Sequence, residues 1–181
     1  MHDGAAARVV RGLKYRGWTQ LARFMAIRML PALHRVVDLP QPVLVPVPLA
    51  PARRRERGFN QAELLADALS ELTGWEVADL LCRVRGGPSQ ARLGRRQRER
   101  RAAGAYAIDP GAMEWLVSYA PTGTDGTGYE PETSALAAVV VDDVITTGST
   151  AGACAAVLEA AGLECLGAVS FARTAPAIEG G

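Results

Sequence analysis

The sequence has few cysteines, a single lysine and no long hydrophobic run. Its three cysteines, Cys82, Cys154 and Cys165, are far apart and form no CxxC pair, so buried thiols are a better expectation than a zinc site or a disulfide framework. No apolar segment is long enough to span a bilayer, and the first residues lack the basic-then-apolar form of a signal peptide. We therefore expect a soluble cytoplasmic protein that forms one domain, residues 1–181.

Charge is divided unevenly between the two halves of the chain. The formal net charge is +1, but residues 1–101 hold 19 basic and 9 acidic side chains, whereas residues 102–181 hold 1 basic and 10 acidic side chains. Of the 20 basic residues 19 are arginine, and the one lysine is Lys14. This asymmetry indicates an anionic partner for the first half of the chain.

The stretch 139–150, VVVDDVITTGST, carries the strongest functional signal. Its β-branched apolar residues predict a strand buried on both faces, and the carboxylates of Asp142 and Asp143 follow where that strand should end. A turn rich in hydroxyl side chains then leads into a predicted helix over residues 151–161. Ligands of open α/β sheets bind beyond the carboxyl ends of strands, and a turn before a helix offers backbone N–H groups to an anion.

Two acids beside an anion site make physical sense if they hold sugar hydroxyls or a divalent cation. The expected ligand therefore carries a phosphate and a polyol and is accompanied by Mg²⁺. The alternative is a buried strand that ends in an ordinary polar turn and a helix cap.

The N-terminal region, residues 1–38, is expected to be helical. Two segments are predicted within residues 5–37, with Gly17 ending the first helix and Thr19 capping the second. Pro31 is expected to kink or end the second helix.

A short strand is predicted around residues 43–45, and its flanking prolines restrict it to an edge or an irregular strand end. Four arginines in the segment 53–57 are predicted to lie on a loop that could hold pyrophosphate, although a solvated basic turn is the alternative. Asn60 and Glu63 resemble a capping box that begins a helix, and Gly74 ends that helix.

The remaining chain predicts short strands, two irregular segments and a final strand. Strands are expected within 80–84 and 105–108. Between them, residues 86–104 form an Arg-rich segment that is either a mobile loop or a basic surface that binds polyanions non-specifically. Residues 120–135 are predicted to be a flexible insertion. A last strand over residues 163–171 completes a β-α-β unit around the central motif.

Four motifs together resemble a known family. Residues 13–17 (LKYRG), 45–48 (VPVP), 57–61 (RGFNQ) and the Asp-Asp stretch 139–150 occur in this order in the ComF/GntX-like phosphoribosyltransferases, the competence protein ComF family. The resemblance implies an α/β fold of the type I phosphoribosyltransferase (Rossmann-like) kind, with a mainly parallel central sheet flanked by helices and a mobile Arg-rich loop. The N-terminal zinc-binding segment that is common in this family is expected to be lost or truncated here.

The resemblance also assigns roles to residues. Asp142 and Asp143 are expected to face the ribose of phosphoribosyl pyrophosphate and to meet Mg²⁺ indirectly, through ribose hydroxyls or water. The residues implied to bind the 5-phosphate are Thr146, Thr147, Gly148, Ser149 and Thr150. Those implied to bind the pyrophosphate are Pro48, Leu49, Arg57, Arg98 and Lys14.

The implied function is transfer of the phosphoribosyl group to an unidentified acceptor, usually a nitrogen. Asp142, Asp143 and Thr146 are the catalytic candidates, although a threonine hydroxyl is a poor general base at neutral pH. Two alternatives stay open: a regulator that binds phosphoribosyl pyrophosphate without turnover, and an accessory protein of DNA uptake that binds single-stranded DNA or the competence machinery through its arginines. No motif names the acceptor, the pathway or the oligomeric state, for which a homodimer is one candidate.

Overall fold

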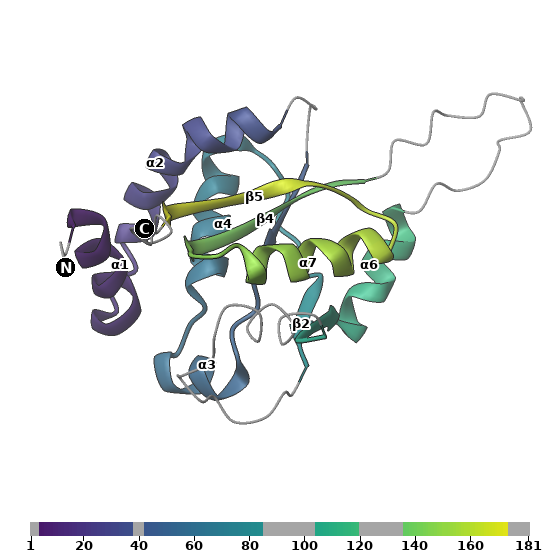
Figure 1. Ribbon diagram of the computed structural model, residues 1–181, viewed down its shortest axis with the longest axis horizontal. Helices are drawn as coiled ribbons and strands as arrows, with labels where there is room; N and C mark the ends of the chain where they lie inside the picture. The colour runs from purple at the N-terminus through teal and green to yellow at the C-terminus, as the bar shows by residue number, and fades with distance from the viewer. Residues whose placement is uncertain (1–3, 38–41, 85–103, 120–135, 174–181) are drawn as a thin grey trace, which may run out of the picture.

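The computed structural model describes residues 4–37, 42–84, 104–119 and 136–173 (Figure 1). Its helical elements are α1 (Ala5–Arg16), α2 (Leu21–Val36), α3 (Pro51–Arg57), α4 (Gln61–Thr73), the 3-10 turn η1 (Pro110–Ala112), α6 (Met113–Tyr119) and α7 (Ser149–Ala160). Its strands are β1 (Val43–Pro46), β2 (Leu81–Arg83), β3 (Tyr106–Ile108), β4 (Ala137–Ile145) and β5 (Glu164–Arg173). None of the described helices is long and apolar enough to cross a membrane.

Three parallel strands form the central sheet in the order β1-β4-β5. The apolar stretch of β4 lies in the middle, and its residues 137–141 are buried. One face of the sheet packs on α2 and α4, and α7 packs on the other face (Figure 1). The prediction of an α/β fold with a parallel sheet flanked by helices is therefore confirmed, and the narrower assignment to the type I phosphoribosyltransferase fold stays a prediction.

The two N-terminal helices agree with the sequence in part. Helix α1 ends at Gly17, which adopts the left-handed conformation with φ of 63°, as the C-cap pattern predicts. Of the two outcomes predicted for Pro31, an end of the second helix is wrong, because α2 continues through this residue to Val36, and a kink stays a prediction. The apolar side chains of Met29 and Leu33, one on each side of this proline, are almost fully buried, and this burial favours an unbroken helix.

The region after β1 corrects a second prediction. Strand β1 lies at the edge of the three-stranded sheet, as its prolines predict. The arginines of 53–57, however, lie on a short helix, α3, and not on a loop. Pro51 stands in the first turn of α3, where its missing N–H and fixed φ favour helix initiation, and Gly58 ends the helix in the left-handed conformation.

Strand β4 is longer than the sequence predicts. Asp142 and Asp143 lie within the strand, because the pairing with β5 continues through Asp142 opposite Ser170 and Ile145 opposite Arg173. The strands β2 and β3 confirm the two short predicted strands and pair antiparallel with each other. Residues 86–103 of the predicted loop and the predicted insertion 120–135 lie outside the described residues.

Candidate functional site

The carboxyl ends of β1 and β4 meet at one edge of the sheet. The two strands are adjacent and parallel, with Pro46 opposite Val141, so the segments that follow them leave the sheet side by side. After β1 the chain enters α3, and after β4 it makes a short turn into α7. Helix α1 lies at the same end of the sheet in Figure 1, so this edge brings together segments that are far apart in the sequence.

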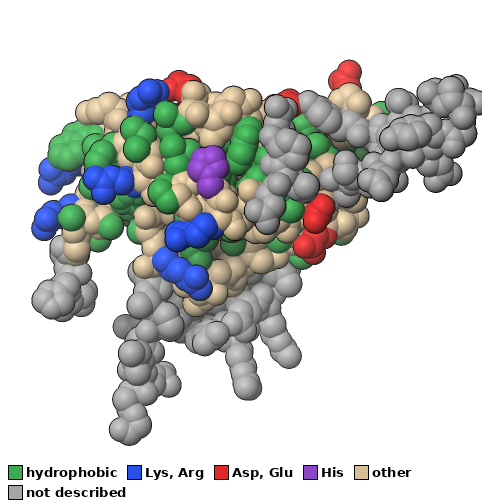
Figure 2. Space-filling model, turned by 90° about the horizontal axis from the view of Figure 1, so that it is seen from above, with side chains coloured by type: hydrophobic (Ala, Val, Ile, Leu, Met, Phe, Trp, Pro, Cys, Tyr) green, Lys and Arg blue, Asp and Glu red, His purple; other side chains and the backbone are tan. Residues whose placement is uncertain are grey.

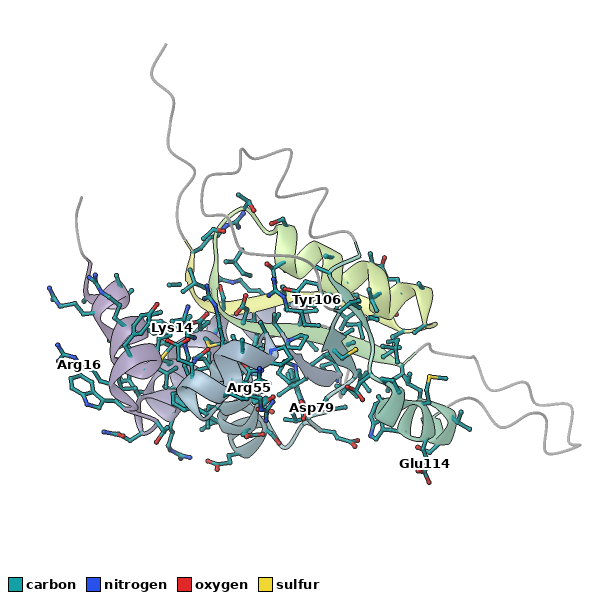
Figure 3. The ribbon with its side chains drawn as sticks, turned by 90° about the horizontal axis from the view of Figure 1, so that it is seen from below. Lys14, Arg16, Arg55, Asp79, Tyr106 and Glu114 are labelled. Carbon is teal, nitrogen blue, oxygen red and sulfur yellow. The ribbon has the colours of Figure 1, made fainter. Side chains whose placement is uncertain are left out.

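Asp143 is held by Lys14. The Asp143 carboxylate is buried, and its Oδ2 lies 2.6 Å from the Nζ of Lys14, whose side chain is 22% exposed. The contact is an ion pair and not a well-directed hydrogen bond. The only lysine of the chain thus faces the acidic motif, whereas Arg16 on the same helix projects away from the molecule (Figure 3).

Asp142 faces the other side of the sheet. Successive residues of a strand point to opposite faces, and the electrostatic neighbours of Asp142 include Tyr106 and Cys154, which lie on the α7 side. Burial and the adjacent Asp143 carboxylate raise the pKa of Asp142 to about 7, although the Asp143 backbone N–H, 2.8 Å from Asp142 Oδ1, opposes this rise. The two carboxylates are therefore adjacent, but β4 directs them to different environments.

The turn after β4 is open. Thr146 and Thr147 are exposed, and Gly148 enters α7 with φ of 79°, a left-handed conformation that favours glycine. Gly148, the N-cap residue, has no side chain that could cap the helix. The Thr147 hydroxyl donates to Ser149 Oγ at 2.9 Å. Thr150 instead hydrogen-bonds Tyr106. The first amides of α7 therefore lie at the surface beside exposed hydroxyls, an arrangement that suits a phosphate.

The segment after β1 is fastened by Asn60. This side chain is buried, and its Oδ1 accepts from the Ala62 backbone N–H at 3.1 Å, which confirms the predicted cap of α4. Its Nδ2 donates to the Val47 carbonyl at 3.0 Å and to Glu63 Oε1 at 3.2 Å. Asn60 therefore fixes the start of α4 and the end of β1 relative to each other.

Arg57 links this segment to α1. Its guanidinium lies 5.2 Å from the ring centre of Tyr15, and its Nη1 donates to Gln61 Oε1 at 2.8 Å. Gln61 is buried, and its Nε2 has no partner among the described residues. Together with the ion pair of Lys14, these contacts join the motif residues of 13–17, 57–61 and 139–150 into one contiguous group.

Two of the sequence-predicted residues line a separate cavity. Pro48 and Leu49 border a space of about 680 Å³ whose walls also include Asp79, Arg83 and Trp115. Its lining also includes Pro46 of the motif 45–48 and Asn60 of the motif 57–61, so the cavity lies beside two of the motif segments. Arg98, the remaining pyrophosphate candidate, lies outside the described residues.

Asp142 and Asp143 do not form a complete metal-coordination site by themselves. Among the residues that the structure describes, no group of three His, Cys, Asp or Glu side chains could hold a metal ion. Mg²⁺ prefers an octahedral shell of oxygens, so an ion at this edge would need oxygens from a bound substrate or from water. The indirect role of Asp142 and Asp143 stays a prediction.

Comparisons with known proteins find two similar proteins that are named for DNA utilization. No family model matches it. It is 34% identical over 133 residues to the DNA utilization protein YhgH of Salmonella typhi, an alignment that covers 72% of this chain and 48% of the relative. It is 33% identical over 109 residues to the protein of the same name from Salmonella typhimurium, covering 59% of this chain and 38% of that relative. The chain thus spans less than half the length of either curated relative.

Proposed function

We propose that the chain is a Mg²⁺-dependent phosphoribosyltransferase that binds phosphoribosyl pyrophosphate at the carboxyl edge of β1 and β4. The observation that carries this proposal is the convergence of three motifs at that edge, through the contacts of Lys14 with Asp143 and of Tyr15 with Arg57. Ligands of open α/β sheets bind beyond the carboxyl ends of the strands, so motifs that meet at this edge are well placed to serve one site.

Each part of the edge fits one part of the substrate. The open turn 146–150 and the first amides of α7 offer donors to the 5-phosphate. Asp142, which is only partly buried, would accept from ribose hydroxyls, whereas the buried Asp143 carboxylate is held by Lys14. Arg57 would supply a planar cationic donor for pyrophosphate. Bound Mg²⁺ would neutralise charge on the leaving pyrophosphate.

The proposed reaction is a displacement at the anomeric carbon. The lone pair of an acceptor nitrogen forms a bond to that carbon while the bond from the carbon to pyrophosphate breaks, and the bonding electrons leave with the pyrophosphate. The acceptor nitrogen then loses its extra proton to solvent. The two aspartates favour the positive charge that develops on the sugar ring, and Arg57 favours the negative charge on the leaving group.

Calorimetry with phosphoribosyl pyrophosphate and Mg²⁺ tests the binding step. We expect the wild-type chain to release heat and Asp142→Asn to bind at least about tenfold more weakly, the loss of roughly one charge-assisted hydrogen bond. Glu164→Gln, which removes an exposed carboxylate at the start of β5, at the opposite end of the sheet from Asp142, is the matched control and should bind as the wild type does. Equal binding by Asp142→Asn and the wild type would contradict the proposal.

Turnover separates an enzyme from a regulator. Pyrophosphate release is measured with a panel of amines and nucleobases as acceptors. Release that depends on one acceptor class supports the transferase. Binding without any release supports the regulator that keeps the site without turnover.

A second candidate function is nucleic-acid handling. The observation that favours it is the charge of the N-terminal layer: α1 and α2 together contain Arg8, Arg11, Lys14, Arg16, Arg23, Arg28 and Arg35 and no acidic residue. A helical layer whose charged side chains are all basic is typical of a surface that binds polyanions. The relatives named for DNA utilization agree with this candidate. Binding to DNA that weakens steeply with salt would support it.

A further inference from the structure

The N-terminal helices form a cavity that the phosphoribosyl pyrophosphate proposal does not use. It has a volume of about 710 Å³ and lies between α1 and the start of α2. Three arginines, Arg8, Arg11 and Arg16, and two aromatic residues, Tyr15 and Trp18, line it, and none of its lining residues is acidic. We call this cavity the α1 groove.

Its aromatic rings are exposed beside cations. Tyr15 is 70% exposed and Trp18 is 43% exposed, which is unusual for large aromatic side chains. The Arg16 guanidinium lies 5.2 Å from the ring centre of Trp18, and Arg57 lies at the same distance from Tyr15. Each ring is therefore paired with a cation at the surface and is not buried in the core.

The position of Trp18 is built into α1. A Cβ atom added at Gly12 would lie 2.7 Å from Trp18 Cε3, so only glycine at this position lets the indole lie against the helix. Gly17, in the left-handed conformation, ends α1 immediately before Trp18 and turns the chain back over the helix. The sequence therefore places the Trp18 ring against the backbone of α1, between arginine side chains.

The charge around the groove extends along both helices. Among the described residues, Lys14 of α1 forms an ion pair with Asp143, and Arg23 of α2 forms one with Glu71. Figure 2, which shows the molecule from above, also displays basic side chains scattered among hydrophobic ones and few acidic side chains. A polyanion that enters the groove therefore meets a surface of one sign.

We propose that the α1 groove binds single-stranded nucleic acid, with Arg8 and Arg16 on the phosphates and Tyr15 and Trp18 as stacking platforms for bases. This inference rests on the second candidate function and gives it a site. Cations that follow a sugar-phosphate backbone, combined with aromatic rings that stack on bases, are the two elements that single-stranded binding requires. Duplex bases are already stacked on each other, so a duplex could use the arginines only.

Fluorescence anisotropy with the full chain tests the specificity. The probe is a labelled oligothymidine of about 20 nucleotides, which exceeds the site sizes of single-stranded binding domains. We expect it to bind, and an unlabelled single strand to compete at least about tenfold better than a duplex of the same length, the contribution of about one stacked base. Competition by the duplex that equals competition by the single strand would refute the stacking role.

Substitutions in the groove test the location. Arg8→Gln combined with Arg16→Gln should weaken binding by about tenfold or more and reduce the slope of log affinity against log salt by about two. Arg83→Gln is the matched control, because Arg83 is exposed on β2 over Tyr106 and lies outside both α1 and α2, and it should change affinity by less than about twofold.

Trp18 gives an independent readout. Trp18→Leu should weaken binding by about tenfold, whereas Trp18→Phe should retain most of the affinity because a phenyl ring still stacks. Quenching of intrinsic tryptophan fluorescence by unlabelled oligothymidine should disappear in both variants, because Trp75 and Trp115 lie outside the groove. Thermal unfolding confirms that each variant is folded.

The outcomes separate the two proposed functions. If the folded chain binds no single-stranded DNA, both the groove and the nucleic-acid function fail. If it binds but the groove variants match the wild type, the groove is refuted and the nucleic-acid function needs another surface. Calorimetry with phosphoribosyl pyrophosphate should be unchanged in Trp18→Leu, so the transferase proposal is tested separately.

Discussion

The segments that follow β1 and β4 leave the same edge of the sheet but are stabilised in different ways. After β1, Asn60 makes three hydrogen bonds that tie the strand end to the start of α4. After β4, the turn exposes Thr146 and Thr147, and the hydrogen bonds that involve Thr147 stay within the turn. The first segment is a fixed wall of the site, whereas the second is an exposed turn whose local hydrogen bonds a bound phosphate could replace. Substitutions in the segment after β1 should therefore mainly lower stability, whereas substitutions in the turn after β4 should mainly lower ligand affinity.

The largest effect on stability is expected at Asn60. Asn60→Ala removes the cap of α4 and leaves the buried Val47 carbonyl without its donor, so we expect a loss of about 3 kcal/mol in the free energy of unfolding. Asn60→Asp keeps the acceptor for Ala62 but loses the donor, so its loss should be intermediate. Urea denaturation measures both variants, and equal stability of Asn60→Ala and the wild type would contradict the fixed-wall description.

A smaller loss is expected for the ion pair that joins α1 to β4. Lys14→Met leaves the buried Asp143 carboxylate without its cation and should cost about 2 kcal/mol, less than for a fully buried pair because Lys14 is partly exposed. Adding Asp143→Asn should restore part of this loss, because the uncompensated charge is removed. A double variant whose loss equals the sum of the two single losses would show that the pair contributes no coupling.

Asp142 should make stability depend on pH. Its pKa in the folded chain is about 7 and its ordinary value is 3.8, so the folded chain holds this proton more tightly than the unfolded chain. The stabilisation is fully present below about pH 4 and is lost as the pH rises through about 7. We expect a contribution of roughly 1–2 kcal/mol, discounted because the side chain is only partly buried. Urea titrations at pH 4.5 and pH 8 should show a smaller difference for Asp142→Asn than for the wild type.

The smallest stability effect is expected at the open turn. Thr147→Ala removes an exposed hydroxyl and should change the free energy of unfolding by less than about 0.5 kcal/mol. Its affinity for phosphoribosyl pyrophosphate should nevertheless fall about tenfold, the effect of about one hydrogen bond to a charged group. A variant that loses stability but keeps affinity would reverse the comparison between the two segments.

Much of the fold could be predicted because its signals are local. The cap at Asn60, the helix end at Gly74 and the apolar run of β4 each depend on neighbours within a few residues. The errors arose where tertiary packing outweighed a local preference. Burial of Met29 and Leu33 carries α2 past Pro31, and pairing with β5 extends β4 through the acidic pair. The helix of 51–57 was missed because its arginines have no apolar periodicity to reveal it.

The candidate site likewise has a part that the sequence predicts and a part that depends on tertiary packing. The motifs indicate that Asp142, Asp143 and Arg57 carry chemistry, but they do not indicate what these side chains contact. The pairing of Lys14 with Asp143 and the contact of Arg57 with Tyr15 depend on how α1 lies against the sheet, and no local pattern encodes that position. The α1 groove was missed for a related reason: Tyr15 belongs to a motif at a predicted helix end, Trp18 belongs to no motif, and only their exposure reveals a surface role.

The sequence by itself determined the buried parallel strand, the glycine and asparagine caps and the uneven charge, because these follow from side-chain chemistry and short-range geometry. The tertiary structure alone decided which charges meet and which rings stay exposed. Both outcomes depend on how helices pack on the sheet, and packing is set by the shape of the whole core, which no single segment of the chain contains.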